Sequence, residues 1–158
     1  MLPLVKQLAS IYPDIAFRAG SKFYWSPETN EVVYNRRLNS LQAQWALLHE
    51  TSHALLNHKT YHNDFQLVEM EMSAWERAKQ LASELNMTEI DENHIQDCLD
   101  TYRDWLHQRC LCPTCKTRCL QTTSTLYQCH NCGSEWRVSA SRFCRAYRLN
   151  LPLTSRIA

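Results

Sequence analysis

The stretch WALLHETSHALLNH, residues 45–58, decides how this chain is interpreted. It places two histidines and a glutamate, in the order HETSH, among leucines and alanines. In a helix, His49 and His53 are one turn apart and lie on the same face, so both imidazoles can reach a single zinc ion. Glu50 would then stand beside the metal without binding it. There it could take a proton from a zinc-bound water that attacks a peptide carbonyl.

The apolar neighbours of this motif strengthen the interpretation. They leave little polar surface, so we expect a largely enclosed helix over residues 41–58. Histidines and a glutamate that are buried without partners would each destabilise the fold. A chance pair of histidines on a buried helix is therefore the weaker alternative, and the pattern predicts a metal site.

Length and composition limit the class of protein. With 158 residues, of which 44% are hydrophobic and 21% charged, the chain can form either one compact domain or one small domain plus a mini-domain. A formal net charge of +1 predicts no particular class of partner. The sequence contains no signal-peptide pattern and no apolar run of membrane-spanning length, so we expect a cytoplasmic protein.

The N-terminal part of the chain predicts an α+β fold. Two strand-like runs, KFYWS and EVVYN, flank the turn residues 27–30 and indicate a small antiparallel sheet. Ser40 and Asp91 are suited to cap helices. The only glycines, Gly20 and Gly133, are expected where the backbone needs a shape that other residues resist. Apolar periodicity predicts helices over residues 3–12, 41–58, 64–86 and 92–108.

A hydrolytic zinc site needs a third protein ligand in addition to the two histidines. Leu56 and Lys59 stand where a metzincin would have glycine and histidine, and this excludes that class. The remaining candidates are His58, His62, Glu69 and Glu71.

The two glutamates differ in the face of the 64–86 helix on which they lie. Glu71 falls within the apolar stripe, where a carboxylate needs a cation, whereas Glu69 falls on the polar face. We therefore predict Glu71 as the third ligand. His58 is expected at the end of the preceding helix, where the helix dipole favours it, and His62, in a loop, stays open as an alternative.

These two segments resemble the ImmA/IrrE family of metallopeptidases, over about residues 1–90. ALLHETSHALLNH is similar to the zinc-binding helix of that family, and EMSAWERA carries its Glu-x-x-Ala pattern. The resemblance implies a minimal zincin-like domain and a protein substrate, often a helix-turn-helix repressor. Ser52 and Ser73 depart from residues common in the family, although neither stands at a ligand position. The implied roles are zinc ligand for His49, His53 and Glu71, in a gluzincin-like site, and general base for Glu50.

Seven of the eight cysteines follow residue 109, where helical periodicity stops. Two C-x-x-C pairs, CPTC and CHNCG, have the spacing of a small β zinc ribbon, in which each pair supplies half of a tetrahedral zinc–sulfur site. We therefore predict a peptidase domain over residues 1–109 and a zinc-ribbon domain over residues 110–158. Free thiols or a redox pair are the weaker alternative, and a contribution of Cys110 or Cys119 stays open. The predicted ligands of this structural zinc are Cys112, Cys115, Cys129 and Cys132.

The end of the chain is basic. After Glu135 it has no acidic residue but several arginines, interleaved with aromatic residues. Such a segment could bind DNA or an acidic protein, although a solvated helix face is an equally good interpretation. The candidate contacts are Arg137, Arg142, Arg145 and Arg148.

Three functions are compatible with these features. The first is an ImmA/IrrE-type zinc endopeptidase, with one catalytic and one structural zinc per chain, that cleaves a regulatory protein. The second is an SprT/Spartan-like protease acting on DNA-associated proteins, which would use His62 or His58 as the third ligand. The third is a non-catalytic, zinc-stabilised adaptor for DNA or protein, in which Glu50 would be dispensable. Glu71 as a ligand favours the first.

Overall fold

The computed structural model describes residues 1–139 and 149–151. The predicted domain division at residue 109 stays a prediction, because compactness alone does not define independently folding parts. The chain forms two compact units, which are Met1–Thr60 with Glu69–Ile95, and Tyr61–Val68 with Gln96–Ala158.

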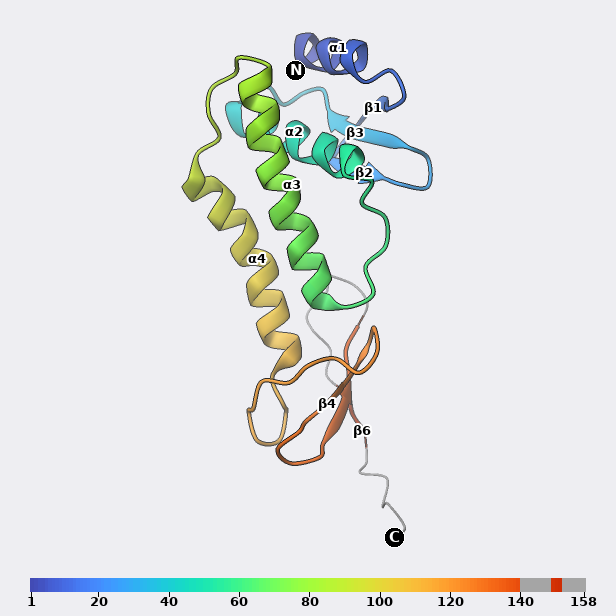
Figure 1. Ribbon diagram of the computed structural model, residues 1–158, viewed down its shortest axis with the longest axis vertical. Coiled ribbons are helices and arrows are strands. Elements are labelled where there is room, and N and C mark those ends of the chain that lie inside the picture. Colours follow the sequence, from blue (N-terminus) through green and yellow to red (C-terminus); the bar gives the residue numbers. More distant parts are fainter. Residues whose placement is uncertain (140–148, 152–158) are drawn as a thin grey trace. The chain divides into compact units, whose positions relative to one another are not determined.

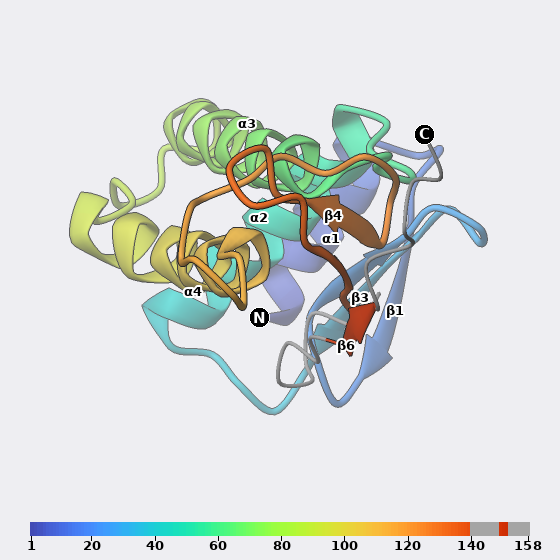
Figure 2. The same cartoon turned by 90° about the horizontal axis from the view of Figure 1, so that it is seen from below.

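The first unit contains a small mixed sheet rather than the antiparallel sheet predicted from the sequence. Its strand order is β1-β3-β2; β2 is antiparallel to β3, as expected, but β1 is parallel to β3. β1 and β3 run side by side in Figure 2. An alternation of apolar and polar residues identifies a strand, but it does not show in which direction the neighbouring strand runs. Here β3 pairs with both β2 and β1 and is therefore the central strand. The elements are α1 (Leu2–Ile11), β1 (Ala16–Gly20), β2 (Tyr24–Ser26) and β3 (Glu31–Asn35).

The central strand is the most buried part of this sheet. Val32 and Val33 are 0% and 1% exposed. Gly20, in the neighbouring strand, has no room for a side chain, because a Cβ atom there would lie 2.5 Å from Val33 Cγ1. The tight contact with a neighbouring side chain explains why a glycine stands in β1, whereas the sequence predicted an unusual backbone shape there.

Helix α2 (Leu41–Leu55) carries the HETSH motif and packs against β2 and β3 (Figure 1). It begins at Ser40, whose side chain accepts a hydrogen bond from the Ala43 N–H, as predicted for a cap. It ends three residues before the predicted position 58, because Asn57 adopts a left-handed backbone conformation with φ of 53°. This turn determines where His58 lies.

The two following helices are close to those predicted: α3 (Asp64–Glu84) and α4 (Glu92–Cys110). Each contributes residues to both units. In the first unit, the apolar stripe of α3 is buried at Ala74, Ala78 and Leu81, each 0% exposed. In the second unit, Leu67 and Val68 of α3 form an apolar cluster with Tyr102 and Trp105 of α4.

The second unit also contains an antiparallel sheet with the order β4-β5-β6. A buried ion pair stabilises its core: Arg109 Nε and Nη2 donate to the Asp64 carboxylate at 2.6 and 3.1 Å. Tyr127 donates a further hydrogen bond to Asp64, and the Trp136 indole N–H donates to the Arg109 carbonyl. The strands are β4 (Leu126–Gln128), β5 (Glu135–Arg137) and β6 (Leu149–Leu151). The architecture as a whole is α+β, as predicted.

Candidate functional site

Helix α2 places His49 and His53 on one buried face. They are 6% and 8% exposed, and their Nε2 atoms lie 3.1 Å apart. The rings meet edge to face, with centroids separated by 4.6 Å. The i, i+4 spacing therefore brings together the two nitrogens that the sequence proposed as ligands.

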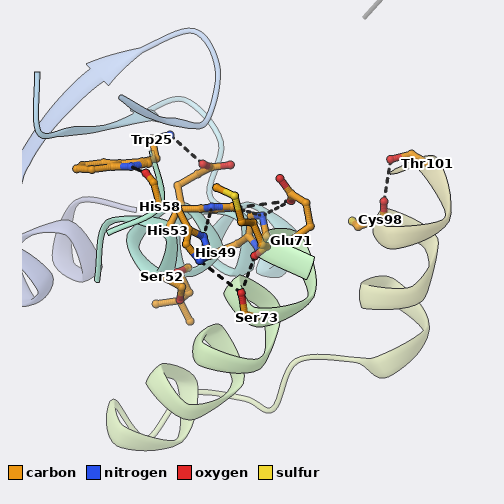
Figure 3. Close-up of polar contacts among 12 residues, drawn as sticks. Trp25, His49, Ser52, His53, His58, Glu71, Ser73, Cys98 and Thr101 are labelled. Carbon is orange, nitrogen blue, oxygen red and sulfur yellow. Dashed lines mark hydrogen bonds and ion pairs between the residues drawn. The ribbon is translucent and has the colours of Figure 1, made fainter. Parts of the chain in front are cut away.

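Glu71 extends from α3 towards this histidine pair (Figure 3). It is 5% exposed, and its Oε2 lies 3.1 Å from His49 Nε2 and 3.6 Å from His53 Nε2. Burial alone raises the pKa of Glu71, but the contacts with the two histidines outweigh it and bring the pKa to about 2. The carboxylate is therefore ionised near neutral pH. Glu69, by contrast, is exposed to solvent.

The distances among these three atoms fit a zinc ion. Nitrogen and oxygen ligands about 2.0–2.1 Å from a tetrahedral zinc are roughly 3.3 Å apart. The observed separations of 3.1, 3.1 and 3.6 Å bracket that value. Two imidazoles and one carboxylate are also a ligand set of hydrolytic zinc sites, in which the fourth position is left to water or substrate.

Glu50 lies beside this cluster on the same helix and is held by the sheet. The backbone N–H of Trp25, in β2, donates a hydrogen bond of 2.8 Å to Glu50 Oε2. The Trp25 indole N–H donates to the carbonyl of His58 at 2.7 Å, so one residue anchors two parts of the site. Nothing in the sequence pattern pointed to Trp25, because its role depends on how the hairpin packs against α2.

His58 does not occupy the helix-end position expected from the sequence. Because α2 ends early, the His58 ring turns back and places its Nδ1 2.9 Å from His53 Nδ1. Burial, followed by the neighbouring His53, lowers the pKa of His58 to about 4, so its imidazole is neutral near pH 7. His62 is exposed, and its backbone N–H donates to Gln66. Neither histidine is in the group of three ligand atoms formed by His49, His53 and Glu71.

A family model described as IrrE N-terminal-like domain, Peptidase_M78, matches residues 10–146. The chain belongs to this metallopeptidase family. The resemblance to ImmA/IrrE proteins is thereby confirmed, and membership implies a metal and a protein substrate. Comparison with curated proteins and with solved structures gave no match.

The match to the M78 family extends beyond residue 90 and includes the cysteine pairs. The Sγ atoms of Cys112 and Cys132 are 3.6 Å apart, and those of Cys115 and Cys129 are 3.4 Å apart. Sulfur ligands about 2.3 Å from a tetrahedral zinc are roughly 3.8 Å apart, so the four thiols have nearly the spacing that one ion requires. The cluster is compatible with the predicted zinc ribbon.

The two C-x-x-C pairs of this M78 chain lie in turns of the same construction. After the first pair, Lys116 has φ of 61° and donates its N–H to the Cys112 carbonyl at 3.1 Å. After the second pair, Gly133 has φ of 75° and donates to the Cys129 carbonyl at 2.9 Å. Gly133 therefore stands at a left-handed position, as the sequence predicted.

The four thiols differ in the direction in which their surroundings shift the pKa. Hydrogen bonding to Thr117 lowers the pKa of Cys115 to about 5, and Ser134 lowers the pKa of Cys132. Burial raises the pKa of Cys112 and of Cys129. The more accessible thiol of each turn is therefore the one whose thiolate is stabilised, and thiolates are the form that binds zinc. Cys119 is buried in the same apolar cluster but outside the group of four.

The proposed arginine contacts are only partly described. Arg137 is exposed on β5, whereas Arg142, Arg145 and Arg148 lie outside the described residues. None of the helices in the described part of the chain has the length and hydrophobicity needed to cross a membrane.

Proposed function

We propose that the chain is a zinc-dependent endopeptidase in which His49, His53 and Glu71 hold the catalytic metal. The observation that supports this most directly is the convergence of their three ligand atoms, all within 4.8 Å of one another. Four cysteines in the second unit would hold a second, structural zinc. When bound, the catalytic zinc would polarise the scissile carbonyl and lower the pKa of a water ligand.

Glu50 would act as the general base. The Trp25 N–H occupies Oε2, so the proton of the attacking water would be taken at Oε1. The same carboxyl would then give that proton to the amide nitrogen of the departing peptide. Because Trp25 holds the carboxylate from the sheet side, the base would keep its orientation through both transfers.

The substrate would bind in an extended form along β2. This strand is at the end of the order β1-β3-β2, and α2 with its site residues packs against it. An extended peptide can add a strand to such an edge, with main-chain hydrogen bonds supplying affinity. An exposed, flexible segment of a regulatory protein would meet this requirement, and a helix-turn-helix repressor is the substrate that the family resemblance suggests.

The test of this proposal is the Glu50→Gln variant, compared with wild type and with Glu69→Gln as a matched control. Each would be co-expressed with a candidate repressor, and cleavage would be followed together with metal content. Glu50→Gln retains size and hydrogen bonding but cannot accept the proton, so cleavage should fall about 10²–10⁴-fold with metal unchanged. Equal cleavage by Glu50→Gln and wild type, with zinc bound in both, would contradict the proposal. The chain would then be better explained as a zinc-stabilised adaptor.

A further inference from the structure

We propose that His58 is a positioning residue that sets the tautomer and ring orientation of His53, with Ser73 completing the connection. This inference rests on the proposed function only in taking His53 as a zinc ligand. Its basis is the contact between ring nitrogens, with His58 Nδ1 located 2.9 Å from His53 Nδ1 (Figure 3). Outer partners of this kind fix the orientation of a metal-binding imidazole.

The direction of the hydrogen bonds follows from the atoms that face the cluster. His53 presents Nε2 to His49 and Glu71, so as a ligand it must carry its proton on Nδ1. That N–H would donate to His58 Nδ1, which must then be the acceptor. A neutral His58 consequently carries its own proton on Nε2.

The hydrogen bonds beyond His58, to Ser73 and from Ser73 to Met70, run in the same direction. His58 Nε2 faces Ser73 Oγ at 3.4 Å, and the Ser73 hydroxyl donates to the carbonyl of Met70 at 3.0 Å. Every donor therefore meets an acceptor, from the ligand on α2 to the carbonyl that precedes Glu71 on α3. The series joins the two helices that supply the three candidate ligands.

The backbone N–H and the backbone carbonyl of His58 are both hydrogen-bonded. The end of α2 is a Schellman turn, in which the His58 N–H donates to the His53 carbonyl and the Asn57 N–H donates to the Ala54 carbonyl, both at 3.0 Å. The His58 carbonyl accepts the Trp25 indole hydrogen bond. With both groups held, the backbone from which the ring extends is fixed beside His53.

His49 is held in a different way. Its ring stacks on Trp75 with a centroid separation of 4.2 Å, and its Nδ1 is buried without a hydrogen-bond partner among the described residues. Stacking fixes the ring plane but does not select which nitrogen carries the proton. Of the two histidines, His53 thus has a hydrogen-bond partner, His58, that can select its tautomer, and His49 has none among the described residues.

The test measures metal affinity of the full chain and needs no substrate. The histidine site would be emptied with a chelator while the cysteine cluster retains its metal, and the affinity of the emptied site for Co²⁺ would be measured by chelator competition, using visible absorption. Any Co²⁺ bound by the cysteines is recognised by its thiolate charge-transfer bands. His58→Phe keeps a ring but removes the acceptor, and should weaken binding about 10–100-fold. His58→Asn places an amide oxygen near the Nδ1 position and should recover most of this loss. His62→Ala, at an exposed histidine, should bind as wild type.

Ser73 provides a second test, because it is exposed and its substitution should not disturb folding. Ser73→Ala should weaken Co²⁺ several-fold and change the absorption of the histidine site, while Ser73→Thr, which retains the hydroxyl, should not. Wild-type affinity and spectrum in both His58→Phe and Ser73→Ala would overturn the inference. Loss of affinity that His58→Asn fails to recover would also overturn it, since packing alone would then explain the effect. Neither result depends on cleavage, so failure here is distinguishable from failure of Glu50→Gln to abolish proteolysis.

Discussion

The two candidate metal centres obtain their ligands in different ways. The cysteine cluster takes all four from two similar turns, in which each C-x-x-C pair is held by local backbone hydrogen bonds. The histidine site would take two ligands from α2 and a third from α3, and its residues also contact β2 and the turn after α2. Four sulfurs complete a tetrahedral zinc, whereas two nitrogens and an oxygen leave a position for chemistry. This difference supports our proposal of a structural role for the first and a catalytic role for the second.

Removing the cysteine ligands should have the largest effect. In the double variant Cys112→Ser, Cys129→Ser we expect zinc to fall from two to one per chain and the second unit to lose its fold, because zinc binding in such clusters contributes about 10 kcal/mol or more to folding. Elemental analysis and near-ultraviolet circular dichroism would measure both. Cys119→Ser is the control: it alters a thiol that is buried in the same apolar core but lies outside the group of four, and should retain two zinc ions. Zinc loss in that control would mean that Cys119 is a ligand.

Removing the third ligand should separate the two centres. Glu71→Gln should empty the histidine site while the cysteine site stays filled, and affinity should fall by more than about 100-fold, since even the loss of an outer partner costs about 10–100-fold. Glu69→Gln, on the same helix but exposed, should retain both ions. Zinc content and chelator competition would show the difference. If His62→Ala emptied the site and Glu71→Gln did not, the SprT-like assignment would be preferred.

The same contrast explains what the sequence could predict. The C-x-x-C spacing and the i, i+4 histidines are local patterns, and the burial of Glu71 followed from helical periodicity. The positions of Trp25 and Ser73 could not be predicted, since they depend on how β2 and α3 pack around α2. The parallel pairing of β1 with β3 was missed for a similar reason: alternation specifies a strand but not its neighbour. For His58, the left-handed Asn57 ended α2 early and redirected the ring.

The buried ion pair of the second unit should be the next largest determinant of stability. Asp64→Asn would leave Arg109, 1% exposed, without its counter-charge, and should destabilise the unit by about 3–5 kcal/mol. Urea unfolding, followed by tryptophan fluorescence, would measure this. Glu31→Gln offers the comparison in the first unit, where Arg18 and Glu31 form an ion pair at the surface. That substitution should hardly move the unfolding midpoint, because solvent screens exposed charges.

The smallest effect we predict concerns the start of α2. Ser40→Ala removes the side-chain acceptor of the Ala43 N–H and should destabilise the first unit by about 1 kcal/mol. Ser10→Ala, at an exposed position within α1, should be neutral or slightly stabilising, because alanine favours a helix interior. Urea unfolding of the two variants would give this difference.

The zinc content of the Ser40→Ala variant tests whether the histidine site depends on the stability of α2. His49 lies more than two turns after the cap and is fixed by contacts with Glu71, His53 and Trp75, so Ser40→Ala should retain zinc and cleavage activity. Loss of zinc in Ser40→Ala, at a temperature where the protein is still folded, would show that the site depends on the stability of the whole helix. The contacts between α2, β2 and α3 would then not suffice to hold the ligands. This outcome would remove the distinction between a locally built cysteine cluster and a histidine site built by packing.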